Sequence, residues 1–136
     1  MFQRSLQLWQ SSRQLRLIAM TFVAFTLWSS WGLYANYSHG LPTAMLAGLI
    51  QGLQSALSTF LGSAFIELLY SRLHQFKHAI LVVTVTASTS SFSFMCAMHY
   101  LLGTPQILLT VAPVTVMATI YCWSYTTSLA KPLART

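Results

Sequence analysis

Apolar residues fill four long stretches of the chain, and polar residues gather in the short connections between them. A helix rises 1.5 Å per residue, so about 20 apolar residues cross the hydrocarbon core of a bilayer. Each stretch is near or above that length. The pattern therefore predicts an all-α, polytopic membrane domain over 17–130, with transmembrane helices at about 17–34, 43–70, 79–101 and 105–129.

The two ends of the chain differ from these stretches. Residues 1–16 are largely polar, but Phe2, Leu6 and Trp9 recur at helical spacing. This narrow stripe predicts a short helix at the membrane interface that continues into the first span. A frayed terminus accounts for the same residues equally well. Residues 131–136 form a short tail.

Lysine and arginine occur in only three segments, which alternate with the predicted outer turns. They precede the first span, lie between the second and third, and follow the fourth: Arg4, Arg13, Arg16, Arg72, Lys77, Lys131 and Arg135. Because cytoplasmic loops are enriched in these residues, both termini are expected in the cytoplasm. The expected location is the inner membrane of a bacterium.

Charged residues make up 6% of the chain, against about a quarter in soluble domains, which excludes a soluble fold. The net charge of +6 does not indicate a nucleic-acid partner, because the cations lie at helix ends and not on one basic face. They are placed to meet anionic headgroups, so membrane lipids are the expected partners.

The two halves of the chain align at an offset of 63 residues. Eight of the 26 positions from 21 to 46 are then identical, and the run Tyr-x-x-Gly-x-Pro recurs at both predicted outer turns. Gly40 and Gly103 suit a left-handed conformation after a helix, and Pro42 and Pro105 suit the start of the next. The offset relates helices of the same orientation, which predicts two helical hairpins in a parallel repeat.

The second stretch carries a polar stripe, with Gln51, Ser55, Thr59, Ser63 and Glu67 spaced four residues apart. In lipid such a face must meet another helix, a polar cavity or a polar ligand. A helix-packing face is the simpler interpretation. The functional interpretation is a groove that accepts a lipid headgroup or a sugar.

Three glycines of the same stretch are predicted to be helix-packing positions, because small residues let two helices approach closely. They are Gly48, Gly52 and Gly62, the first two in a Gly-x-x-x-Gly pair.

Glu67 is the only acidic residue, near the expected cytoplasmic end of its helix. An ionisable residue in a membrane span marks a candidate functional site, although a snorkelling carboxylate or an ion pair with Arg72 explains it as well. In the functional interpretation, Arg72 and Lys77 hold a phosphate on the same rim.

Residues for catalysis or metal binding are scarce. One carboxylate, without a nucleophile motif or a phosphate-binding glycine loop, predicts a chain that is not an enzyme and carries no cofactor. His74 and His78 lack a further ligand at metal spacing, so no metal site is expected. Cys96 and Cys122 lie at different depths, which favours two thiols over a disulfide. No role follows for His39 and His99, near the outer turns.

Small size, four spans, basic termini and a parallel hairpin repeat together resemble the GtrA-like family of membrane proteins. The points of resemblance are Arg16 at the entry to the first span, the turns Gly40-Leu41-Pro42 and Gly103-Thr104-Pro105, and the exit of the second helix from Phe65 to Arg72. Members of that family are linked to the translocation of polyprenyl-phosphate sugars. The resemblance implies a substrate attached to a lipid carrier.

Three functions follow from these observations. The first is to aid translocation or binding of a lipid-linked substrate, with headgroup contacts from Glu67, Arg72, Lys77, Gln51, Ser55 and Thr59. The second is a non-catalytic accessory subunit of a larger membrane complex, in a homo- or hetero-oligomer. The third is a small homo-oligomeric channel lined by the hydroxyl-rich third helix.

Overall fold

The computed structural model describes residues 2–131, and for residues 2–13 and 16 it describes the backbone alone. Within these residues the chain forms four α-helices and one short 3-10 helix: α1 (Phe2–Asn36), η1 (Tyr37–His39), α2 (Leu41–Leu73), α3 (Ala79–Leu101) and α4 (Ile107–Ala130). All four α-helices are long and apolar enough to cross a membrane. The prediction of an all-helical chain with four such helices is therefore confirmed.

The helix bounds depart from the predicted spans in three places. The helix α1 is continuous from Phe2 to Asn36, so no break separates the interfacial segment from the first span. The helix α2 extends beyond 43–70 at both ends. The helix α4 begins at Ile107, because Pro105 lies in the preceding turn, and it continues through Pro113.

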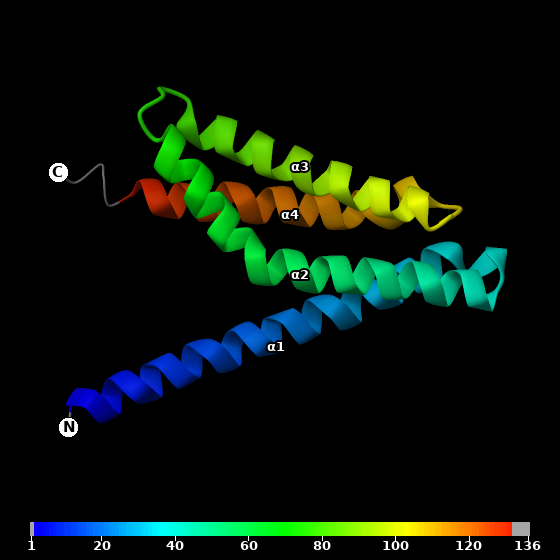
Figure 1. Cartoon of the computed structure of the whole chain (residues 1–136), viewed down its shortest axis with the longest axis horizontal. Helices are drawn as coiled ribbons and strands as arrows, with labels where there is room; N and C mark the ends of the chain where they lie inside the picture. The colour runs from blue at the N-terminus through cyan, green and yellow to red at the C-terminus, as the bar shows by residue number, and fades with distance from the viewer. Residues whose placement is uncertain (1, 132–136) are drawn as a thin grey trace.

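Successive α-helices run in opposite directions, which gives the molecule two distinct ends (Figure 1). The glycine end holds the turns after α1 and α3. Both turns pass through a glycine in the left-handed region, Gly40 at φ 95° and Gly103 at φ 70°, as the repeated run predicts. The basic end holds the start of α1, the 74–78 loop and the end of α4.

Near the glycine end, α1 and α2 pack at backbone distance. A Cβ added to Gly48 would lie 2.6 Å from the Ser29 carbonyl oxygen, and one added to Gly32 would lie 3.0 Å from the Gly48 Cα. A Cβ on Gly52 would overlap the Ser29 hydroxyl. Gly62, also expected as a packing position, has no atom within 4 Å of such a Cβ.

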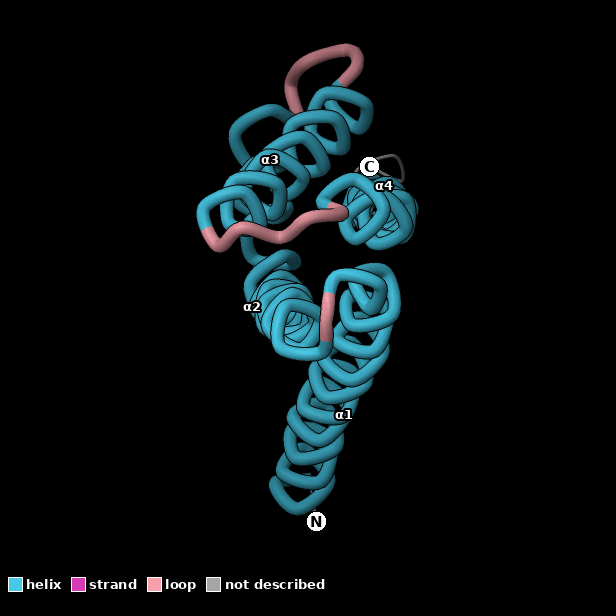
Figure 2. Tube along the Cα trace, turned by 90° about the vertical axis from the view of Figure 1, so that its right-hand side faces the viewer, coloured by secondary structure: helices cyan, strands magenta, loops and turns pink. Residues whose placement is uncertain are grey.

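Toward the basic end the two helices separate. Figure 1 shows α1 diverging from the other helices while α2 changes direction and crosses toward the start of α3, and Figure 2 shows the same departure of α1 from the side. Only 6% of the apolar segment of α1 is buried, against 44% of the corresponding segment of α2. The first half of α1 therefore makes little contact with the rest of the chain.

The apolar cores lie among α2, α3 and α4. One cluster is near the basic end and the other is nearer the glycine end; their buried residues are Ile66, Val83, Ala87 and Cys122 in the first, and Met95, Val111 and Val114 in the second. The helix α1 reaches only the second cluster, where Trp28 packs against it.

Candidate functional site

His99 of α3 is fully buried at the glycine end. Its Nε2 lies 2.8 Å from Oε1 of Gln51 on α2, and its Nδ1 lies 2.8 Å from the hydroxyl of Thr104. With the Gln51 oxygen facing the ring, Nε2–H donates to Gln51 and the Thr104 hydroxyl donates to Nδ1. A neutral imidazole is thus satisfied at both nitrogens, and no charge is buried in the bundle.

Gln51 connects this histidine to the polar stripe of α2. Its Nε2 lies 3.5 Å from the Ser55 hydroxyl and 3.8 Å from the Met95 sulfur, while Ser55 donates back to the Gln51 carbonyl at 2.7 Å. Thr59 is half-buried and donates to the Ser55 carbonyl at 2.8 Å. Gln51 and Ser55 are buried inside the bundle. This part of the stripe lies against another helix and does not line an open groove.

Asn36, the last residue of α1, forms a second buried network. Its Nδ2 donates to the Gly32 carbonyl at 2.9 Å and to the Thr110 hydroxyl at 2.8 Å. Its Oδ1 accepts from the backbone N–H of Gln106 at 3.0 Å. Asn36 therefore holds the start of α4, where a helix has backbone donors without partners of its own.

The two networks connect the first hairpin, α1 and α2, to the second hairpin, α3 and α4. Asn36 ends the first helix and bonds to the fourth, whereas His99 lies near the end of the third helix and bonds to the second. The two residues are 63 positions apart, the same offset that aligns Tyr37 with Tyr100. Each hairpin thus supplies hydrogen-bond partners that the other lacks.

Glu67 lies in a more exposed group of polar residues between α2 and α4. Its carboxylate accepts from the Tyr125 hydroxyl at 2.5 Å, and the Ser63 and Tyr121 hydroxyls are 2.6 Å apart. The rings of Tyr121 and Tyr125 stack with centroids 5.6 Å apart. We call Ser63, Glu67, Tyr121 and Tyr125 the tyrosine ladder. Among the residues that the structure describes, Glu67 makes no ion pair with Arg72 and bonds Tyr125 instead.

An open cavity of about 320 Å³ lies at the basic end, beside the 74–78 loop. It is lined by one lysine, two histidines and the indole of α4, namely Lys77, His74, His78 and Trp123, together with Tyr70 and apolar residues. Of the charged residues expected on this rim, Lys77 lines the cavity, and Arg72 and Glu67 do not. The three expected charges therefore do not share one site.

Sequence reasoning missed Asn36 and Thr110, and it gave His99 no role. The signal that points to Asn36 and His99 is their equivalence at the 63-residue offset, since both are polar residues at or near the end of the first helix of a hairpin. It missed the partners because they depend on how the two hairpins pack against each other.

Cys96 and Cys122 are free thiols, as predicted. Between residues 2 and 131, no group of three or more His, Cys, Asp or Glu side chains is placed to hold a metal ion. The chain matches no protein-family model, no curated protein and no solved structure.

Proposed function

We propose that this chain binds the phosphate headgroup of a lipid-linked substrate at its basic end and aids the passage of that substrate across the bilayer. The observation that carries the proposal is the basic cavity beside the 74–78 loop. Lys77 supplies a positive charge, His74 and His78 supply imidazole nitrogens, and Trp123 supplies an indole of the kind that lies at lipid headgroup depth.

The charges around this cavity favour an anion. Glu67 does not line it, so no carboxylate competes with a phosphate for Lys77. The 74–78 loop is exposed, which lets a headgroup approach from the membrane surface. By the distribution of lysine and arginine, this is also the end expected in the cytoplasm.

A binding experiment on the full chain tests the first step. The protein is placed in phosphatidylcholine nanodiscs and titrated with farnesyl phosphate, a short polyprenyl phosphate. Replacing Lys77→Gln removes a charged donor and is expected to weaken binding by about tenfold or more. Arg72→Gln is the matched control, because Arg72 is a cation on the same rim outside the cavity lining. Equal losses in both variants, or no loss in either, contradict the proposed site.

A transport experiment tests the second step. Vesicles containing the chain and a fluorescent polyprenyl phosphate are treated with a membrane-impermeant quencher, which reports how fast the probe changes leaflet. The unmodified chain is expected to accelerate this exchange over empty vesicles, and Lys77→Gln to reduce the acceleration. Binding without any acceleration restricts the function to capture of the lipid.

The accessory-subunit alternative rests on a different observation, the exposure of α1. The side chains of Ile18, Phe22 and Val23 are each more than half exposed, on a helix of which the rest of the chain buries little. A partner helix that covers this face would give a stable complex on mild detergent extraction. Recovery of the chain as a monomer alone contradicts this alternative.

The channel alternative needs hydroxyl groups on one face of α3. Thr84 and Ser88 are buried, whereas Thr86 and Ser90 are exposed on other faces of that helix. This division gives a water pathway less support than headgroup binding. The proposal remains that of a non-enzymatic protein.

A further inference from the structure

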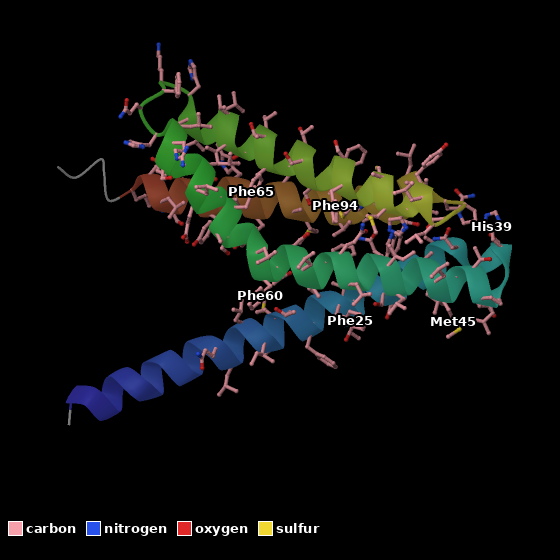
Figure 3. The ribbon with its side chains drawn as sticks, viewed as in Figure 1. Phe25, His39, Met45, Phe60, Phe65 and Phe94 are labelled. Atoms are coloured by element: carbon pink, nitrogen blue, oxygen red, sulfur yellow. The ribbon has the colours of Figure 1, made fainter. Side chains whose placement is uncertain are left out.

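A cleft opens where α1 leaves the bundle. Its deeper part is a cavity of about 360 Å³ between α1 and α2, with Leu17, Phe22 and Phe25 on one wall and Ala56 and Phe60 on the other. Figure 3 shows Phe60 on the side of α2 that faces α1. The lining of this part is almost entirely apolar.

The α2 wall of the cleft becomes polar toward the basic end. Ala56, Phe60, Ser63 and Glu67 follow one another at intervals of four, three and four residues, so they share one face of the helix. Ala56 and Phe60 line the apolar cavity, whereas Ser63 and Glu67 belong to the tyrosine ladder.

One face of α4 also lies toward α1, although the apolar cavity is lined by α1 and α2 alone. Thr110, Val114, Tyr121 and Tyr125 lie close to one face of α4 by helical spacing. At the glycine end, Thr110 on this face bonds Asn36 of α1. Tyr121 and Tyr125 follow on the same face, nearer the basic end, where α1 has moved away from the other helices (Figure 1).

The cleft is therefore apolar at mid-membrane and polar with a carboxylate near one surface, the order of polarity along a phospholipid of that leaflet. We propose that it binds a membrane phospholipid whose headgroup ends in a primary ammonium, as in phosphatidylethanolamine. The acyl chain lies against Phe22 and Phe60, and the ammonium lies at Glu67 and the stacked rings of Tyr121 and Tyr125.

The chemistry of the ladder selects a cation. Glu67 is exposed and makes no ion pair with any side chain that the structure describes. A carboxylate at this depth is stabilised by an opposite charge, and the faces of tyrosine rings attract ammonium groups. A primary ammonium also donates hydrogen bonds to the carboxylate, which the quaternary ammonium of phosphatidylcholine cannot do. This site is separate from the basic cavity, which favours an anion.

Spin-labelled lipids measure the preference directly. The full chain is reconstituted in phosphatidylcholine vesicles with lipids labelled on the acyl chain, and the protein-associated fraction is read from the electron spin resonance spectrum. The headgroup series is phosphatidylethanolamine, its N-methyl and N,N-dimethyl derivatives, and phosphatidylcholine. Association is expected to fall along the series by about fivefold in total, the size that the loss of one typical hydrogen bond gives, because each methyl group removes an N–H donor. A flat series overturns the proposal and requires no variant.

Two variants locate the effect. Glu67→Gln keeps an acceptor for Tyr125 but removes the charge, and it should abolish the headgroup preference. Lys77→Gln should preserve the preference, so loss of phosphate binding and loss of ammonium binding are distinguishable. A preference that persists in Glu67→Gln overturns the assignment to the ladder.

A cross-linking experiment tests whether a second copy of the chain occupies the cleft instead. The variant Phe60→Cys is made in a background without the two native cysteines. Efficient cross-linking between copies in these vesicles would show that a second copy occupies the cleft, and it would refute the lipid site.

Discussion

Polar side chains have different surroundings in the half of the bundle near the glycine end and in the half near the basic end. Near the glycine end, Gln51, His99 and Asn36 are fully buried and bonded to neighbouring helices. Toward the basic end, Glu67 is exposed and α1 has separated from its neighbours. A polar side chain in a membrane helix therefore serves assembly where helices are close and is free to meet lipid where they are apart.

The half near the glycine end, where the helices pack closely, depends on glycine residues as much as on hydrogen bonds. Gly48 and Gly52 let α1 reach α2, and this contact lies in the same half as the polar networks of Asn36 and His99. Toward the basic end, Gly62 contacts no neighbouring helix, and the two helices separate there. The spacing between α1 and α2 thus changes along a single pair of helices.

The largest effect is expected from Gly48→Ala. The added Cβ would lie 2.6 Å from the Ser29 carbonyl oxygen, a backbone atom, so α1 must move. We expect a loss of about 1–3 kcal/mol in the free energy of unfolding, measured in mixed micelles of mild detergent and dodecyl sulfate. Gly62→Ala is the matched control and should gain up to about 1 kcal/mol, since its Cβ meets open space within a helix. The same sign in both variants would contradict the contrast between the halves.

A somewhat smaller loss is expected from His99→Leu. The change leaves the buried amide of Gln51 and the hydroxyl of Thr104 without their shared partner, at a cost of about 1–2 kcal/mol. Gln51→Leu alone should cost a similar amount, and the double variant should cost less than the sum of the two. Additive losses would show that the two side chains do not interact.

Asn36→Leu should cost about 1 kcal/mol, because the start of α4 loses a side-chain acceptor and Thr110 loses a donor. The loss should be additive with that of His99→Leu, since the two networks share no residue. Unfolding of the single and double variants in the same micelles gives the coupling. A coupling as large as either single loss would mean that the two networks act as one.

The smallest effect is expected from Tyr125→Phe in the open half. Its hydroxyl donates to an exposed carboxylate, which can bond to water or a lipid headgroup instead. We expect a change within about 0.5 kcal/mol in the same unfolding assay. A loss of unfolding free energy as great as that of His99→Leu would mean that the tyrosine ladder stabilises the bundle as much as the buried networks at the glycine end do.

Much of this fold follows from the sequence, because each helix is specified locally. Length and hydropathy give the four helices, and the repeated Tyr-x-x-Gly-x-Pro run gives both left-handed turns at Gly40 and Gly103. Their spacing alone identifies Gly48 and Gly52 as helix-packing positions. What spacing does not give is the partner of each position, which depends on the distance and angle between helices.

The polar residues illustrate that limit. Gln51 and Glu67 belong to one stripe in the sequence, yet the first is buried against α3 and the second is exposed beside α4. A spacing of four residues drifts around the helix, and over the stripe this drift turns the side chain by about 160°. Arg72 and Lys77 are both cations of the same rim, and only Lys77 lines the basic cavity. A side chain's neighbours at a helix end depend on loop geometry, which periodicity does not encode.

The exchange of contacts between the hairpins has a consequence for how the protein enters a membrane. Asn36 is synthesised 70 residues before Gln106 and 74 before Thr110, and Gln51 is synthesised 48 residues before His99. The first hairpin therefore leaves the ribosome with two amides, each of which still lacks the hydrogen-bond partner that the second hairpin supplies. We expect this hairpin to remain next to water, or within the insertion machinery, until the second hairpin arrives, so that release into lipid depends on synthesis of the second hairpin.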